Sequence, residues 1–548
     1  MKFRGFLLSI VVILAMAGVI GANDSDGGVI ELYDCGVLDV PNGYYVLMND
    51  ITTSGTCFEI KADGITLDLN SRRITGNEKG EGIVIRDFGS ATIMNGQIYS
   101  FSEGISLQNS NNDKILANLI ANNDDIGIYL DDSSNNLIKD NFVQSNQEAG
   151  IFIDDGFGNN ISDSFVINGD DTGIYLDGTF DTLIKNTIIQ NNLIDFHIDA
   201  YSDDECENTL VDVIGSDNKP IYYFNEKVDV KDLEASEVIL CNADNSVLED
   251  ISVIQKTRKN NGIYIHRTEN SHLSKVRVEK TFDGIFIEDS HKNVLTKMHL
   301  ISNYGGGITI YDSTNNIIKD SYIIDTVKGG IILDESHSNK FYNNFFNNSN
   351  NFFAYNKYPN AWNVSQKNGP NIIKGPFIGG NFWGNPKGTG YSQICKDSND
   401  DGFCDEPLIL GENNVDYLPL SLPEPRLFNF SNSALKMTDV SVSITINPSK
   451  PKLGENVMAL ITIENLGNFP TNVSLTSGIT WPPGSGGPGG GGGGSCNYCI
   501  SLNPGEKHYT IQNIATPNPG KYTVSASIDS YILDPNQKNN KAFLEFVV

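Results

Sequence analysis

The sequence predicts an all-β protein, with a parallel β-solenoid over residues 29–424 and a β-sandwich over residues 438–548. Three observations lead to this prediction. A Gly-Ile dipeptide recurs every 22 or 23 residues, and columns of apolar residues follow with the same period. Beyond Pro425 the period is replaced by strand-like runs such as VSVSITI and KYTVSASID, separated by turns such as NPGE and PNPG, which is typical of a sandwich.

The repeated unit opens with short alternating segments such as GIYLDDS and GIFIEDS. After an Asn-rich turn an apolar residue returns with the same period, as at Ile115, Ile138, Ile161 and Ile184. A parallel solenoid requires this pattern, because each coil buries its apolar face only against the next coil. Leucine-rich repeats would need an L-x-x-L-x-L spacing, which is absent, and propeller blades need about 40 residues. The dipeptides begin at Gly82, Gly104, Gly127, Gly150, Gly173, Gly262, Gly284, Gly307 and Gly330.

The period is lost between Tyr201 and Leu240, so we expect degenerate coils or a lateral excursion there. A solenoid also needs closed ends. We expect residues 29–76 to form the N-terminal cap and the segment around residues 397–405 to close the C-terminal end. A linker over residues 425–437 leads to the sandwich, which carries a Gly-rich loop at residues 484–495.

The N-terminus reads as an export signal, because Lys2 and Arg4 precede an apolar run from Phe6 to Ile20 and the small residues Gly21 and Ala22 follow. We therefore expect a signal peptide over residues 1–22, with an uncleaved anchor as the alternative, and no membrane span after cleavage. The net charge of -30, from 68 acidic and 38 basic residues, argues against nucleic acid and anionic lipid surfaces as partners. Cations and neutral or cationic polymers fit this charge better.

The eight cysteines fall into four local pairs, which suggests disulfides formed in an oxidising compartment. Sequence alone leaves the connectivity open. The C-x-x-C of the last pair lacks the helical context of a redox site and the further ligands of a zinc site, so a small disulfide is the preferred interpretation. The pairs are Cys35 with Cys57, Cys206 with Cys241, Cys395 with Cys404, and Cys496 with Cys499.

The G-I-x-L and N-N-x-I-x-x-N repeats and the closing GGNFWG motif resemble the NosD-type right-handed parallel β-helix proteins over about residues 30–422. The segments KLGENVMALITIENLG and GKYTVSASID resemble the CARDB module, an immunoglobulin-like domain associated with surface and adhesion proteins. The resemblance implies a right-handed coil and a non-catalytic sandwich suited to surface-protein contacts. It leaves function open, since this β-helix architecture hosts lyases, hydrolases, epimerases, adhesins and the copper-processing protein that names the family.

The segment DSNDDGFCD has the spacing of a calcium loop, with oxygen ligands at alternate positions and glycine at the sharp turn. The bidentate glutamate of an EF-hand is missing, and a solvated acidic turn is the alternative. We expect a structural Ca²⁺ ion. Its ligands would be Asp397, Asn399, Asp401, the Phe403 carbonyl and Asp405.

The repeats also place aromatic and acidic side chains on the outer face. Because Ile128 and Leu130 point inward, Tyr129 and Asp131 point outward, and the period carries this pattern into later coils. Such a strip could hold a glycan, with sugar rings against the aromatic faces and hydroxyls on the acids. Stacking for stability alone is the alternative. The candidate residues are Tyr129, Asp131, Phe152, Asp154, Tyr175, Asp177, Phe286 and Glu288.

These features predict a secreted or cell-surface protein that binds a glycan or another surface polymer. A structural surface-layer component is one alternative, and a polysaccharide lyase or glycoside hydrolase is another. Carboxylates on adjacent coils would lie ~5 Å apart, as in retaining glycosidases, but every acidic column in a solenoid shares this spacing. A copper site is not expected, because His291 and His337 lie two coils apart in one column.

Overall fold

The computed structural model divides the chain into two compact units, Met1–Leu422 and Pro423–Val548. It describes residues 28–256 and 260–422 of the first unit, and residues 440–447, 450–454, 456–465, 471–480, 482, 499–503, 506–516, 518–530 and 541–548 of the second. The predicted signal peptide (residues 1–22), linker (425–437), Gly-rich loop (484–495) and Cys496 lie outside the described residues, as does the side chain of Cys499. In the described part of the chain, no helix is long and apolar enough to cross a membrane.

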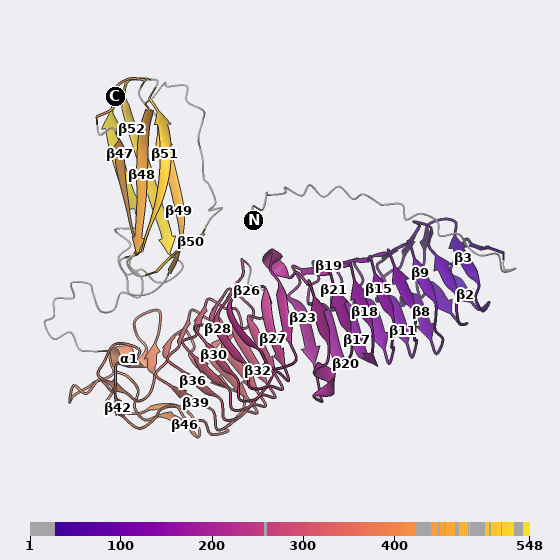
Figure 1. Cartoon of the computed structure of the whole chain (residues 1–548), viewed down its shortest axis with the longest axis horizontal. Coiled ribbons are helices and arrows are strands. Elements are labelled where there is room, and N and C mark those ends of the chain that lie inside the picture. The colour runs from indigo at the N-terminus through magenta and orange to yellow at the C-terminus, as the bar shows by residue number, and fades with distance from the viewer. Residues whose placement is uncertain are drawn as a thin grey trace. The chain divides into compact units, whose positions relative to one another are not determined.

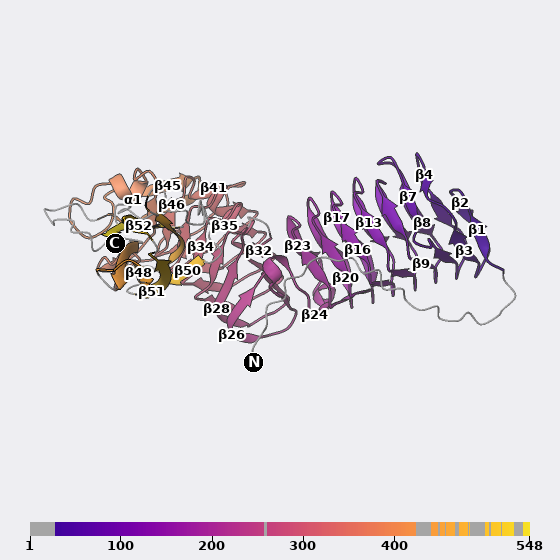
Figure 2. The same cartoon turned by 90° about the horizontal axis from the view of Figure 1, so that it is seen from above.

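The first unit is a stack of coils that runs along one axis (Figures 1 and 2). Its N-terminal section has three parallel sheets, and every coil contributes short strands to them in turn. One sheet has nine strands, from β1 (Ile30–Leu32) to β24 (Thr209–Val211), and another has seven, from β4 (Ile51–Thr52) to β22 (Ile188–Gln190). The third has eight strands: β2 (Gly36–Leu38), β5 (Phe58–Ile60), β8 (Glu81–Arg86), β11 (Glu103–Gln108), β14 (Ile126–Asp131), β17 (Ala149–Phe157), β20 (Thr172–Phe180) and β23 (Ile194–Asp199).

The strand register confirms the predicted columns. Ile138 pairs with Ile115 on one side and with Ile161 on the other, and Ile184 continues the column. All four side chains are buried with at most 1% of their surface exposed. The apolar interior therefore consists of like residues stacked from coil to coil, as a solenoid requires.

Asparagine has two roles in the coils. Inside, Asn141 accepts a hydrogen bond from the Asn118 amide at 3.0 Å and donates to the Ile115 carbonyl at 2.7 Å. This ladder satisfies buried backbone groups at the corners of the coils. At the surface turns, Asn122 (φ 55°) and Asp140 (φ 57°) adopt left-handed conformations, which asparagine and aspartate tolerate better than most residues. The coils are therefore rich in asparagine because their corners need both buried hydrogen-bonding side chains and residues that tolerate left-handed conformations.

The irregular segment after β23, called the excursion below, is a degenerate coil, because its strand β24 still pairs with β21 and its Ile214 with Ile188. Two buried apolar clusters meet at this segment. The 3₁₀ helix η1 (Asp204–Cys206) lies in this excursion, and Cys206 forms a disulfide with Cys241 at the end of β27. A new sheet begins there. Its strands are β25 (Ile221–Phe224), β27 (Glu237–Cys241), β29 (Ile263–His266), β32 (Ile285–Glu288), β35 (Gly306–Tyr311), β38 (Gly329–Asp334) and β41 (Phe352–Ala354).

The other faces of the C-terminal section belong to one eleven-stranded sheet. The long strand β28 (Val247–Ile254) joins them, because its first half pairs with β30 (His272–Ser274) and its second half with β31 (Arg277–Glu279). The coils end at β44 (Phe382–Gly384), where Trp362 and Trp383 are buried. The helix α1 (Tyr391–Ile394) and the hairpin of β45 (Leu408–Gly411) and β46 (Asn414–Asp416) follow. Disulfides Cys35–Cys57 and Cys395–Cys404 lie near the two ends of the described stack.

The second unit is a sandwich of two antiparallel sheets, as the alternating C-terminal runs predict. One sheet contains β47 (Val440–Asn447), β48 (Asn456–Asn465) and β51 (Lys507–Ala515). The other contains β50 (Cys499–Leu502), β49 (Thr471–Thr480), β52 (Lys521–Ser530) and β53 (Lys541–Val547). Inward residues such as Val457, Ile461 and Val524 form its core. Alternating inward and outward residues give this arrangement one apolar face per sheet.

Candidate functional site

The candidate site lies on the outer face of the sheet that contains β14, β17, β20 and β23. Parallel pairing brings Tyr129, Phe152, Tyr175 and His197 into one row, with one residue from each coil. Two positions further along each strand, the carboxylates form a second row. The second row consists of Asp131, Asp154, Asp177 and Asp199.

The aromatic row continues past the excursion into the C-terminal section. The His197 ring lies 5.4 Å from the Tyr264 ring at an interplanar angle of 17°, and Tyr264 stacks on Phe286 at 5.2 Å. Strand β29 therefore takes the place of the next coil, although 66 residues separate Ile198 from Tyr264, whose hydroxyl donates to the Ile198 carbonyl at 3.3 Å. A single aromatic ladder thus connects the two sections.

The rings stack on one another, so the ladder turns ring edges outward. Phe152 and Tyr175 are 4.6 Å apart between centroids and only 5° from parallel. Phe152 and Tyr175 therefore cover one another's faces, whereas Tyr129 is tilted by 35° against Phe152 and Tyr175 by 50° against His197, and Tyr264 is completely buried. The expectation that sugar rings lie against aromatic faces does not fit the stacked pair of Phe152 and Tyr175. Only the end rings have small neighbours, with Tyr129 beside Ser106 and Phe286 beside Thr309.

The polar atoms of the site form repeated phenol–carboxylate pairs. Tyr129 donates to Asp154 at 3.1 Å, and Tyr175 donates to Asp199 at 2.5 Å, each reaching one coil forward. Tyr264 donates in the same way to Glu288. The acids of the strip are thereby fixed as hydrogen-bond acceptors. These pairs are Tyr129 with Asp154, Tyr175 with Asp199, and Tyr264 with Glu288.

The carboxylates of the strip influence one another's protonation. Partial burial and then the neighbouring charge of Asp154 raise the pKa of Asp131. Burial and the charge of Asp199 raise the pKa of Asp177, although the Tyr201 hydroxyl opposes the shift. Asp199 differs from its neighbours. Burial raises its pKa, but His197, which lies 3.2 Å away, and the hydrogen bond from the Tyr175 hydroxyl together lower the pKa by more. The strip therefore combines one stabilised carboxylate with neighbours that bind protons more readily.

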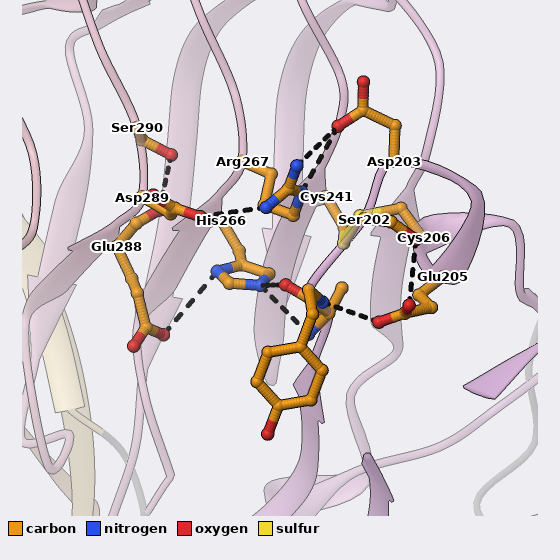
Figure 3. A network of polar contacts seen from close by, with 12 residues as sticks. Ser202, Asp203, Glu205, Cys206, Cys241, His266, Arg267, Glu288, Asp289 and Ser290 are labelled. Atoms are coloured by element: carbon orange, nitrogen blue, oxygen red, sulfur yellow. Dashed lines mark hydrogen bonds and ion pairs between the residues drawn. A yellow bond between two sulfur atoms is a disulfide. The ribbon is translucent and has the colours of Figure 1, made fainter. Parts of the chain in front are cut away.

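At the junction a polar network surrounds His266, on strand β29 (Figure 3). The Nε2 atom of His266 lies 3.1 Å from the Ala200 amide nitrogen and 3.0 Å from the Ala200 carbonyl, and Nδ1 faces Glu288 at 3.6 Å. Burial lowers the pKa of His266, so the neutral ring is favoured. Arg267 binds Asp203 at 3.0 Å and Asp289 at 2.9 Å. The network holds the excursion against the first coils of the C-terminal section.

Six of the eight residues that sequence reasoning assigned to the strip lie on this face, and Phe286 and Glu288 lie on β32 of the next sheet, where the ladder continues. Sequence reasoning missed the residues at the junction. His197 and Asp199 each lie 22 residues after their counterparts Tyr175 and Asp177, so the period could have found them. The signal was hidden because Asp195 replaces the expected glycine. Tyr201 lies in the excursion, where no sequence period connects it to the strip, whereas His266 lies 22 residues before Glu288 and could have been found by the period.

The predicted calcium loop is a tight turn near Cys395–Cys404. Asp397 accepts hydrogen bonds from the amides of Asp401 at 3.1 Å and Gly402 at 2.9 Å, and Gly402 has a φ of 86°, as the sharp-turn position requires. Asp405 accepts hydrogen bonds from Ser398, and Phe403 is buried.

The oxygen donors of this loop suit calcium chemically, because Ca²⁺ prefers carboxylate and carbonyl ligands. Asn399 donates to the Asp401 carboxylate at 3.0 Å in the present arrangement. Within residues 28–256, 260–422 and the described strands of the sandwich, no group of three or more His, Cys, Asp or Glu side chains is arranged to hold a metal ion. The calcium site stays a prediction. His291 and His337 flank Thr314 in one column, two coils apart.

The comparisons with known proteins agree with this architecture. Residues 205–388 match the family described as "Periplasmic copper-binding protein (NosD)", and residues 35–194 match the family described as "Right handed beta helix region". A comparison with curated proteins finds no match.

Solved structures are similar to separate parts of the chain. A CARDB domain from Pyrococcus furiosus, in complex with di-metal ions, has 20% identity and a TM-score of 0.17 and covers 20% of this chain and 89% of its own. An alginate lyase from Paenibacillus sp. str. FPU-7 has 14% identity and a TM-score of 0.28, and the match covers 46% of this chain and 95% of the lyase chain. The catalytic domain of a GH87 alpha-1,3-glucanase in complex with nigerose has 13% identity and a TM-score of 0.30, and the match covers 61% of this chain and 64% of the glucanase chain. At these values the similarities say nothing about function.

The two family matches and the parallel coils lead to the same assignment. Together the matched segments span the N-terminal and C-terminal sections of the solenoid, on both sides of the excursion. The chain is a parallel β-helix protein, matched over residues 35–194 by the right-handed β-helix family and over residues 205–388 by the NosD family, with a C-terminal β-sandwich of two antiparallel sheets.

Proposed function

We propose that this chain is an exported, cell-surface or secreted protein that binds a glycan along the ladder of phenol–carboxylate pairs. The observation that carries the proposal is the repetition of these pairs along the ladder, as in Tyr129 with Asp154 and Tyr175 with Asp199. Three disulfides and the periplasmic description of the matching family support a location outside the cytoplasm.

A linear polymer suits this site because the site itself repeats. Successive coils lie ~4.8 Å apart, so each coil offers a carboxylate at a regular interval along the strip. The acids accept hydrogen bonds from ligand hydroxyls, while the stacked rings keep the acids in place. Because Phe152 and Tyr175 cover one another's faces, recognition depends mainly on the acceptors and on the end rings.

The proposal is tested by measuring how well variants of the strip carboxylates are retained on a glycan array. The double variant Asp154→Asn/Asp177→Asn removes two acceptor charges and leaves every ring in place. We expect its affinity for the captured glycan to fall about tenfold or more, since charged hydrogen bonds contribute roughly 1.5–3 kcal/mol each. Asp163→Asn, on another face beside Lys139, is the matched control and should bind as the native protein does.

The same array separates ring contacts from hydroxyl contacts. Tyr175→Phe removes only the hydroxyl that holds Asp199, whereas replacing Tyr129, Phe152 and Tyr175 together with alanine removes the stack. Unchanged retention by both Tyr175→Phe and the Asp154→Asn/Asp177→Asn variant, with melting temperatures also unchanged, would exclude this strip as the binding surface.

A glycoside hydrolase is the second candidate, and one observation favours it. His197 and Asp199 form a 3.2 Å pair beside Asp177 on the adjacent coil, and the environments of the two acids shift their pKa values in opposite directions. Two carboxyls with divergent pKa values on adjacent coils fit the acid and nucleophile roles of a retaining enzyme. New reducing ends released from a bound glycan, and lost in Asp199→Asn, would establish this activity. Binding without release would exclude it for that glycan.

A further inference from the structure

A pocket of about 270 Å³ lies at the C-terminal end of the stacked coils and shares no residue with the strip. We call it the end pocket. Four segments line it: residues 348–352 between β40 (Phe345–Asn347) and the start of β41, residues 383–385 at the end of β44, residues 389–391 at the start of α1, and residues 408–410 of β45. The end pocket is thus formed where the last coil joins the segments that follow it.

Hydrogen bonds within the protein hold the walls of the end pocket in place. Asn351 donates to the Gly384 carbonyl at 2.6 Å, which joins the turn before β41 to β44. The Gln393 side chain accepts hydrogen bonds from the amides of Asn385 at 3.0 Å and Gly390 at 2.7 Å, which joins β44 to α1. The walls are therefore fixed before a ligand arrives, so binding orders few groups of the protein.

The lining combines an apolar part with neutral polar groups. Trp383 is buried, and Phe352, Leu408 and Leu410 pack against the apolar cluster that contains it. Amides and hydroxyls supply the polar part, and each of these groups both donates and accepts hydrogen bonds. The polar side chains are those of Asn348, Ser349, Asn350, Asn351, Asn385 and Thr389.

Some of these polar groups are available to a ligand. Ser349, Asn350 and Thr389 are exposed. The side chains of Ser349 and Thr389 make no hydrogen bond with any residue that the structure describes. Asn350 makes one long contact, from its Nδ2 atom to the Lys328 carbonyl at 3.5 Å. Three side chains can therefore bind a ligand without giving up strong hydrogen bonds within the protein.

The end pocket differs from the strip because it lacks charge. None of the described residues that line it is Asp, Glu, Lys, Arg or His, although the chain carries a net charge of -30. An ion that entered would lose hydration without meeting an opposite charge, and an apolar ligand would leave the amides and hydroxyls without partners. A neutral ligand that carries several hydroxyls avoids both costs.

The volume restricts the size of this ligand. Pockets for small molecules begin at roughly 300 Å³, so a space just below that size suits one sugar ring and not a polymer segment. A peptide chain would need a longer groove. We propose that the end pocket binds a single neutral sugar residue, with the C–H face of the ring against the apolar part and the hydroxyls on the amides. This site is separate from the proposed binding of a glycan along the strip and does not depend on it.

The experiment is saturation-transfer NMR followed by titration, on the full chain, with the methyl glycosides of glucose, galactose and mannose. We expect at least one of them to bind. The uronic acid and the amino sugar that correspond to it should bind about tenfold more weakly, because the pocket offers no charge to replace their hydration. Binding should be equal at low and high salt, since salt screens only charged pairs.

Two variants test the location of the site. Asn350→Ala/Thr389→Ala should weaken binding about tenfold, because it removes two exposed hydrogen-bonding side chains. Ser349→Trp should abolish binding by filling the pocket. Ser54→Trp, at an exposed serine near the other end of the coils, is the matched control and should bind as the native protein does. Asp154→Asn/Asp177→Asn should also bind normally, which separates this site from the strip.

Three outcomes would overturn the proposal. The first is that none of the three methyl glycosides binds. The second is that both pocket variants keep native melting temperatures and native affinity, which would place the binding elsewhere. The third is that the charged sugars bind as tightly as the neutral one, or that a neutral capped trialanine peptide binds more tightly and displaces it. Loss of binding in Asp154→Asn/Asp177→Asn alone would assign the sugar to the strip.

Discussion

Asp195 and Glu237 both occupy positions at which neighbouring coils carry glycine, and both carboxyls are buried. Asp195 pairs in register with Gly173, and Glu237 with Gly262. Asp195 accepts a hydrogen bond from the Ser216 amide at 2.7 Å, but neither oxygen of Glu237 has a hydrogen-bond partner. Burial raises the pKa of Asp195 to about 6, and burial together with Asp195 raises the pKa of Glu237 well above its usual range. The interruption of the solenoid therefore contains an acid that folds in its protonated form.

We predict that Glu237→Gln stabilises the protein at neutral pH. The folded pKa of Glu237 is raised, so its cost is absent below the unfolded pKa of about 4.3 and grows as the pH rises above it, by up to about 1.4 kcal/mol per pH unit. The glutamine variant cannot ionise and avoids this cost. Its melting temperature should match that of the native protein near pH 4 and exceed it at pH 7.5.

Asp195→Asn is the matched comparison, because Asp195 has hydrogen bonds that an amide cannot fully replace. This variant should be less stable than the native protein at pH 7.5. A difference between Glu237→Gln and the native protein that does not vary with pH would show that Glu237 does not titrate within the fold.

The inner asparagine ladder predicts a large effect from a small deletion. In Asn141→Ala the Asn118 amide and the Ile115 carbonyl lose their partners inside the coil. Each buried unsatisfied group costs about 1–3 kcal/mol, so a clear drop in the urea midpoint is expected. Asn122→Gly, at an exposed turn with φ 55°, should leave the midpoint nearly unchanged. Similar midpoints for both variants would contradict a structural role for the ladder.

The disulfide Cys206–Cys241 should protect the excursion locally. It closes a loop with a sequence separation of 35, and such links stabilise by about 2–4 kcal/mol. In Cys206→Ser/Cys241→Ser we expect trypsin to cut after Lys219, Lys227 or Lys231 while the flanking coils, which have their own cores, stay intact. Cys395→Ser/Cys404→Ser is the control. Cleavage at these lysines in the control, but not in the first variant, would refute the assignment.

The calcium prediction is tested by chelation. If the loop binds Ca²⁺, a chelator should lower the melting temperature of the native protein, and Asp397→Asn/Asp401→Asn should start lower and respond no further. Glu406→Gln, an exposed acid nearby, should behave like the native protein. A melting temperature that is independent of both calcium and chelator would leave the loop as a turn held by the Asp397 hydrogen bonds alone.

Much of the fold and part of the site were predictable from the sequence. The columns through Ile138 and through Phe152 follow directly from a period of 22 or 23 residues, because a parallel sheet places equivalent residues side by side. The same period reaches His197 and Asp199, but the Gly-Ile signal does not mark this coil because Asp195 occupies the glycine position.

The other features of the fold and of the site depended on how the chain is folded between β23 and β27. Periodicity alone determined the stacked coils, the outward direction of Tyr129 and Asp131, and the alternating core of the sandwich, because these are local consequences of strand geometry. Only the tertiary structure decided that Tyr264 follows His197 in the ladder, that Phe152 and Tyr175 cover one another's faces, and that His266 contacts Ala200 across the excursion. The physical reason is that the excursion between β23 and β27 breaks the register, and side-chain packing across it follows no sequence period.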